Sequence, residues 1–117
     1  MSLNKFIASA RELKEVNQDI KISVIKDLSE ASNYTDKKNC AIFEWSYSEK
    51  NVEKLIEYIK EHLKICPRIE LWNTTNSKDN NAIVRKCSKL ILNKDYIKEI
   101  WGKESVVQPE CLVVYNS

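Results

Sequence analysis

Residues 40–72, which read CAIFEWSYSEKNVEKLIEYIKEHLKICPRIELW, contain the consecutive elements that decide the fold. The first of them, Cys40–Tyr47, is short, aromatic and partly alternating, which is typical of a strand. Apolar side chains then recur every three or four residues from Val52 to Cys66, which predicts a helix with one buried face. Ile69–Trp72 follows as a second strand. This stretch therefore predicts one strand–helix–strand unit.

A second unit of the same kind follows. Ala82–Leu90 reads as a strand, a short helix opens at Asn93 or Lys94 and carries Trp101, and Cys111–Tyr115 is the last strand. From residue 40 onward the order is thus strand, helix, strand, strand, helix, strand. Two right-handed units of this kind normally merge into one antiparallel sheet with both helices on one face. We therefore predict an α+β fold of the ferredoxin-like βαββαβ type.

The ends of the two predicted helices carry residues with capping or breaking character. Ser46 together with Glu49, or Ser48 alone, offers capping chemistry for the first helix. Pro67 should end that helix, because proline cannot continue it. Gly102 is the only glycine of the chain and follows the second helix, where a residue in the left-handed conformation is common.

The chain before residue 40 adds a helix and a strand to this pattern. From Leu3 to Val16 the apolar residues are again spaced by three and four, which predicts an amphipathic helix. Ile20–Val24 alternates apolar and polar side chains and reads as a half-buried strand. Asp27–Asn39 is rich in Ser, Asn, Asp and Lys and predicts a long loop. We expect these additions to extend or cover the sheet of a single domain, residues 1–117.

The composition is that of an ordinary globular domain and argues against several function classes. Of the 117 residues, 43% are hydrophobic and 31% are charged, which is not typical of a disordered tail. The net charge is only +2, and just three of the 19 basic residues are arginines. Because arginine supplies the planar fork that reads phosphates and guanine, this scarcity argues against nucleic-acid binding. No apolar run approaches the roughly 20 residues of a membrane helix, so no membrane association is expected.

The four cysteines, Cys40, Cys66, Cys87 and Cys111, have neither the spacing of a zinc site nor that of a redox pair. The N-terminal residues mix charges among apolar side chains and do not form a signal-peptide core. We therefore expect reduced and mostly buried thiols in a cytoplasmic protein.

Catalytic and cofactor motifs are missing from the sequence. With one glycine, the chain cannot form a glycine-rich phosphate-binding loop. The single histidine, His62, has no orienting partner that the sequence identifies, which argues against a catalytic triad. His62 and Cys66 share a helix face, but two ligands make a poor metal site, so we interpret both as packing residues. We predict no catalytic residue, no cofactor and no metal.

The sheet face away from the helices is the candidate site. If Ile69 and Leu71 face the helices, strand alternation sends Arg68, Glu70 and Trp72 to the other face. Charged groups beside an aromatic side chain on an uncovered sheet suit a pocket or a dimer interface.

Neighbouring strands are expected to contribute to the same face. On the first strand of the merged sheet, Phe43 and Trp45 are assigned to the core. Glu44, which lies between them, should then point to the face away from the helices. Arg85 of the strand Ala82–Leu90 and Tyr115 of the last strand could lie on the same face. The predicted binding residues are Glu44, Glu70, Trp72, Arg85 and Tyr115.

Three hypotheses for function follow from these patterns. The first is a small cytoplasmic interaction or regulatory module that binds through the open sheet face, as a dimer or with one protein partner. The second is a small-molecule carrier or small enzyme with a pocket formed by Glu44, Glu70, Trp72 and Arg85. The third is an inhibitor or immunity-type protein that binds its partner through the loops Asp27–Asn39 and Asn73–Asn81.

Overall fold

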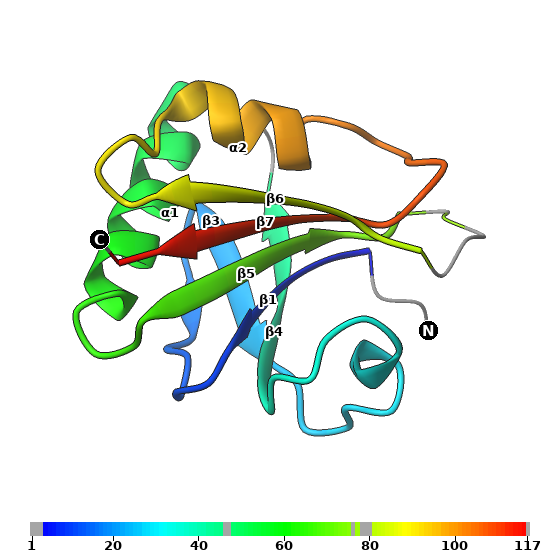
Figure 1. Ribbon diagram of the computed structural model, residues 1–117. Helices are drawn as coiled ribbons and strands as arrows, with labels where there is room; N and C mark the ends of the chain where they lie inside the picture. The colour runs from blue at the N-terminus through cyan, green and yellow to red at the C-terminus, as the bar shows by residue number, and fades with distance from the viewer. Residues whose placement is uncertain (1–3, 46–47, 76, 78–80, 117) are drawn as a thin grey trace.

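The computed structural model describes residues 4–45, 48–75, 77 and 81–116, which form one seven-stranded sheet with two α-helices (Figure 1). The helices are α1 (Glu49–His62) and α2 (Lys94–Trp101), and a short 3₁₀ helix, η1, covers Ala31–Asn33. The strands are β1 (Lys5–Ser9), β2 (Val16–Asn17), β3 (Ile20–Val24), β4 (Asn39–Trp45), β5 (Arg68–Asn73), β6 (Ile83–Ser88) and β7 (Glu110–Tyr115). Their order across the sheet is β2-β3-β4-β1-β5-β7-β6, and all neighbours are antiparallel except β6 and β7.

The ferredoxin-like arrangement of four strands is wrong, although the fold is still of the α+β type. In a ferredoxin-like sheet, the strands of the two strand–helix–strand units interleave. Here β1 lies between β4 and β5, in the place that a strand of the second unit would take. Strands β6 and β7, which α2 connects, are therefore parallel neighbours that extend the sheet beyond β5.

The predicted N-terminal helix is also wrong, and this error explains the difference in topology. Phe6, Ile7 and Ala8 are completely buried. They belong to β1, which has a paired strand on each edge and packed side chains on both faces. A strand buried on both faces carries apolar residues in succession instead of alternately. The predicted helix began at Leu3, which lies outside the described residues.

The helix ends agree with prediction in part. Helix α1 begins after Ser48, whose hydroxyl accepts a first-turn N–H at 3.1 Å, and it ends at His62, earlier than predicted. The alternative cap, Ser46, lies outside the described residues. Gly102 follows α2 but is right-handed, with φ of −78°. A side chain there would collide with the carbonyl of Lys98, so close approach is what requires glycine. In the described part of the chain, neither helix has the combined length and apolar character that crossing a membrane requires.

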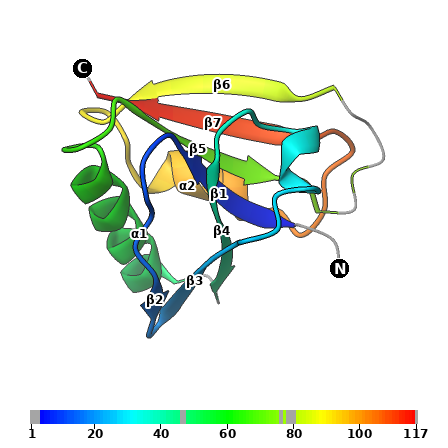
Figure 2. The ribbon, with the colours of Figure 1, turned by 90° about the horizontal axis from the view of Figure 1, so that it is seen from below.

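Both helices pack on one face of the sheet, called here the helix face (Figures 1 and 2). The main core lies between them and the sheet. On the opposite face, called the outer face, residues 25–38 form a capping segment that includes η1. Its side chains Ala31 and Tyr34 pack on the sheet residues Phe6, Cys40 and Trp72, which creates a second, smaller core. The outer face is therefore partly covered.

Candidate functional site

Glu70 and Trp72 lie together on the outer face, as strand alternation predicts. The indole Nε1 of Trp72 donates to Glu70 Oε1 at 2.9 Å. The hydroxyl of Thr35 donates to the same oxygen at 2.6 Å. Because Thr35 belongs to the capping segment, this hydrogen bond connects that segment to β5.

The aromatic side chains around Trp72 close this part of the outer face. Trp72 stacks on Phe6 with ring centroids 5.9 Å apart and planes 4° apart, and Tyr34 of the capping segment packs at 5.8 Å. Trp72 is only 5% exposed. At this position Trp72 stabilises the fold and leaves almost no surface for a ligand.

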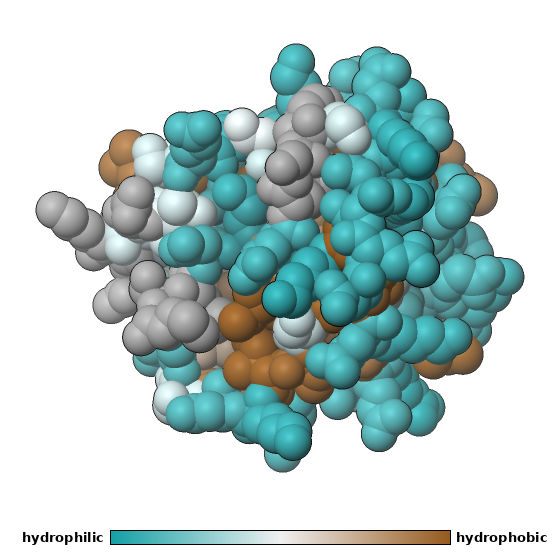
Figure 3. Space-filling view, turned by 180° about the vertical axis from the view of Figure 1, so that it is seen from behind, coloured by the Kyte–Doolittle hydropathy of each residue, from teal (hydrophilic) through white to brown (hydrophobic). Residues whose placement is uncertain are grey.

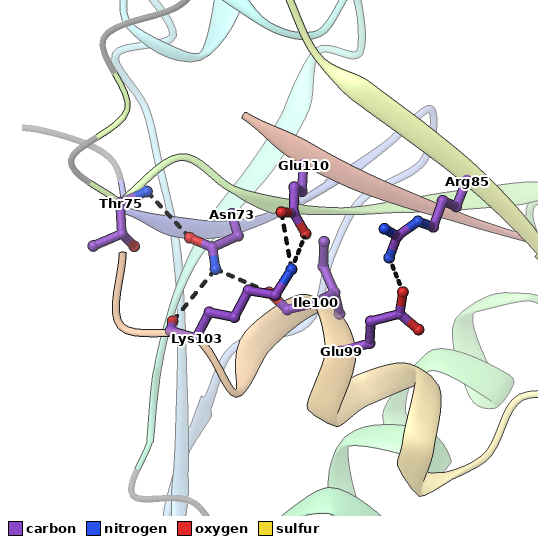
Figure 4. Close-up of polar contacts among 7 residues, drawn as sticks. All are labelled: Asn73, Thr75, Arg85, Glu99, Ile100, Lys103 and Glu110. Atoms are coloured by element: carbon purple, nitrogen blue, oxygen red, sulfur yellow. Dashed lines mark hydrogen bonds and ion pairs between the residues drawn. The ribbon is translucent and has the colours of Figure 1, made fainter. Parts of the chain in front are cut away.

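Two other predicted residues lie elsewhere. Glu44 is exposed on β4, toward the other end of the sheet. Arg85 lies on the helix face, not on the outer face as predicted, and its guanidinium forms an ion pair with Glu99 of α2 (Figure 4). Phe43 is in the main core, as predicted. The side chain of Trp45 lies outside the described part of the structure.

Tyr115, the fifth predicted residue, belongs to an uncovered part of the outer face. In the sheet register, Arg68 of β5 is opposite Tyr115 of β7, and Lys86 of β6 is opposite Val113 of β7. We use the name basic strip for Arg68, Val84, Lys86, Val113 and Tyr115. It holds a hollow of about 350 Å³, whose lining is Pro67, Arg68, Lys86, Val113, Tyr115 and Asn116.

The charges of the two cations of the basic strip have no acidic partner in the described part of the chain. Arg68 and Lys86 are exposed, and neither forms an ion pair with any residue that the structure describes. Glu70 is on the same face, but its Oε1 already accepts two hydrogen bonds. The strip therefore presents positive charge beside exposed apolar side chains.

Lys86 is the residue of this surface that sequence reasoning missed. Arg85 was assigned to the outer face, which placed its neighbour on the helix face. The signal that sets the orientation is Cys87, which is buried in the main core. Since Arg85 and Cys87 share a face, Val84 and Lys86 must point the other way.

The thiols beneath the capping segment are packing residues. Burial, and after it the nearby carboxylate of Glu70, raises the pKa of Cys40 to about 11. The same two causes raise the pKa of Cys111. A thiol that stays protonated at neutral pH is a poor nucleophile. All four cysteines of the chain are buried and free.

His62 is likewise held by backbone groups. Its Nε2 accepts the N–H of Lys14 at 3.1 Å, and its Nδ1 lies 2.8 Å from the carbonyl oxygen of Tyr58, which assigns the ring proton to Nδ1. The thiol of Cys66 donates to the carbonyl oxygen of His62 at 3.3 Å. Within the described ranges, no three His, Cys, Asp or Glu side chains are grouped so that they could hold a metal.

A second polar cluster joins the end of α2 to the sheet (Figure 4). Asn73 is completely buried, donates to the carbonyl oxygen of Ile100 at 2.9 Å and accepts the N–H of Thr75 at 3.1 Å. Close by, Lys103 forms an ion pair with Glu110 at 2.9 Å. Asn73 satisfies a carbonyl at the helix end that has no partner inside the helix. The cluster is therefore structural.

A larger hollow, of about 450 Å³, lies between residues 14–20 and α1. Its polar groups are mostly engaged with the protein itself. The hydroxyl of Tyr58 donates to the carbonyl oxygen of Lys14 at 2.7 Å, and Lys54 is paired with Asp19. The charged lining mixes both signs, with two lysines and three glutamates: Lys14, Lys54, Glu15, Glu57 and Glu61. This arrangement offers no converging set of groups for one ligand.

Comparisons with known proteins do not identify a family. No family model, no curated protein and no solved structure matches this chain. Its function can therefore be argued only from its own residues and their geometry.

Proposed function

We propose that this protein is a cytoplasmic binding module that recognises an acidic segment of another protein through the basic strip. The observation that carries the proposal is the pair of exposed cations, Arg68 and Lys86, which border one hollow and have no acidic partner among the described residues. An acidic segment would supply the missing counter-charges, which favours both the encounter and the correct partner.

The apolar members of the strip support the same proposal. Val84 is 54% exposed and Tyr115 is 37% exposed. Tyrosine is enriched in protein interfaces, and apolar area beside charge is the usual composition of such surfaces. Figure 3 shows the molecule from behind, where hydrophilic side chains cover most of the surface and an apolar patch lies near the lower middle of the view.

A different protein fits the strip better than a second copy of this chain. A two-fold symmetric dimer places the same surface of both copies face to face. Arg68 and Lys86 would then approach identical cations, and such like-charge contacts disfavour association. Like-charge contacts therefore favour a protein partner of a different kind over self-association.

The cytoplasmic location is supported by the thiols. All four cysteines are free, including Cys40 and Cys111, which both belong to the second core. Free thiols are the rule in a reducing compartment, whereas secreted proteins of this size commonly bridge them.

Charge reversal on the strip tests the proposal. The probe is a short peptide with blocked ends in which glutamate alternates with valine, called here the glutamate–valine peptide. Its affinity for the protein is measured by fluorescence anisotropy at low salt. We expect Lys86→Glu to weaken binding at least about tenfold, because an attractive contact becomes a repulsive one. A matched peptide with lysine in place of glutamate should not bind.

The control is Lys60→Glu, which makes the same change of net charge on an exposed position of α1. It should leave the affinity within about twofold of the wild type, because α1 packs on the helix face whereas the basic strip lies on the outer face, so Lys60 would not contact the bound peptide. Equal affinities of Lys86→Glu and Lys60→Glu would refute the proposal, since the peptide would then respond only to net charge.

A further inference from the structure

Strand β6 is the outermost strand at one end of the sheet. It pairs with β7 alone, and Figure 2 shows no described element beyond it. Its first four residues are all exposed. The strand at the other end, β2, has only two residues. Long unpaired edges are templates for the addition of another strand, whereas very short ones are protected.

The backbone of β6 shows which groups are unpaired. Ile83 donates its N–H to the carbonyl oxygen of Pro109 at 2.8 Å, and Lys89 donates to that of Tyr115 at 2.9 Å. Because successive residues of a strand direct their N–H and C=O groups to opposite edges, the odd-numbered residues 83–89 face β7. Val84 and Lys86 therefore direct their backbone groups away from the sheet, where no described residue reaches them.

The unpaired residues Val84 and Lys86 alternate with paired ones along the exposed part of the strand, Ile83–Lys86. Beyond them, the carbonyl oxygen of Ser88 accepts the N–H groups of Ile91 and Leu92, so the chain turns away there. Lys86 thus combines an unpaired backbone with an unpaired ammonium group. Arg85, its neighbour, is different on both counts, since its backbone faces β7 and its side chain is paired with Glu99.

We propose that the acidic partner segment binds as an added β-strand along Val84 and Lys86. This inference rests on the proposed function and specifies how the partner binds. The added strand would donate to and accept from the outward groups of both residues. Strand alternation would place its acidic side chains on the outer face beside Lys86 and its apolar side chains on the other face beside Ile83, which is 38% exposed.

Hydrogen exchange of single amides tests this mode directly, with the glutamate–valine peptide as the probe. In the free protein, the amides of Val84 and Lys86 should exchange quickly, and those of Arg85 and Cys87 slowly. With the peptide at saturation, the amides of Val84 and Lys86 should slow at least about tenfold, because they become hydrogen-bonded. Unchanged exchange of both amides in the saturated complex would overturn the inference.

A proline variant gives an independent measurement. Val84→Pro removes one outward N–H and leaves the inward ladder intact, and proline is tolerated on the free side of an edge strand. It should bind the peptide about tenfold more weakly, the value of one lost hydrogen bond. Val84→Thr, which keeps the N–H, is the matched control and should bind as the wild type does. Circular dichroism verifies that both variants are folded.

A second peptide separates this inference from the proposed function. In an N-methylated glutamate–valine peptide, a methyl group replaces every backbone N–H hydrogen, so the side chains and the charge are kept while all backbone donors are lost. Equal binding of both peptides, with the effect of Lys86→Glu preserved, would overturn strand addition and leave the basic strip as the partner surface. No effect of Lys86→Glu on either peptide would overturn the proposed function itself.

Discussion

Among single residues, Glu70 connects the capping segment with the buried thiols of the outer face. It accepts hydrogen bonds from Thr35 and Trp72, and its charge adds to the effect of burial on Cys40 and Cys111. The negative charge disfavours a second negative charge nearby, which keeps the thiols protonated.

The thiol of Cys40 should make stability depend on alkaline pH. Its pKa is raised from 9.0 to about 11 in the folded protein, first by burial and second by Glu70. Between these values the unfolded chain has lost the proton and the folded chain keeps it, so the free energy of unfolding falls as the pH rises. The contribution of the protonated Cys40 thiol to the free energy of unfolding is complete below about pH 9. It decreases by at most about 3 kcal/mol by about pH 11.

Urea unfolding of the wild type and of Cys40→Ala, with a reductant present, measures this contribution. Other groups that titrate in this range act on both proteins, so only the difference between them is used. That difference should be smaller at about pH 11 than at about pH 8. A difference that is the same at both pH values would contradict the assignment.

Strand β6 shows why the candidate site could be predicted only in part. Alternation within Ile69–Trp72 was correct, because two buried residues define the face without help from other strands. The orientation of β6 was wrong, because Ile83 and Val84 are both exposed and give no alternation. Only Cys87, near the end of the strand, contains the necessary information. Because the alternation of β6 was assigned one residue out of phase, Arg85 was predicted on the outer face, where Lys86 lies.

Among the elements, β5 and α2 are joined by Asn73. Asn73→Ala would leave the carbonyl oxygen of Ile100 and the N–H of Thr75 without these partners inside the protein. Unsatisfied buried groups cost about 1–3 kcal/mol, so the free energy of unfolding should decrease by that amount in urea denaturation. Asn17→Ala, on the exposed residue of β2, is the control and should change it by less than about 0.5 kcal/mol. Equal effects of both substitutions would show that Asn73 does not join the two elements.

Strand β1 explains the main error in the predicted fold. Most later elements, from α1 to β7, were predicted close to their observed positions, because each has a clear local pattern. In β1 the apolar run Phe6–Ala8 is too short for its pattern to distinguish a central strand from one turn of a helix. Its burial depends on pairing with β4 and β5, which lie far away in the sequence. Such pairing is not encoded locally, so the strand order could not be derived.

In the molecule as a whole, the two cores and the uncovered surface have separate positions. The helices cover one face, the capping segment covers part of the other, and the basic strip with the free edge of β6 remains at one end of the sheet. Sequence alternation suggested a binding face, but it could not show that the capping segment covers Trp72. The segment is packed there through Ala31 and Tyr34, whose loop context gives no periodic signal.

A chemical-shift titration of the isotope-labelled protein with the glutamate–valine peptide tests the central claim most directly, because one experiment reports on backbone amides in all parts of the protein. We predict that the largest changes lie in β6 and β7, around Lys86 and Tyr115, and that they diminish as salt is added. Largest changes in α1 and residues 14–20, with β6 and β7 unaffected, would contradict the claim that the basic strip is the partner surface.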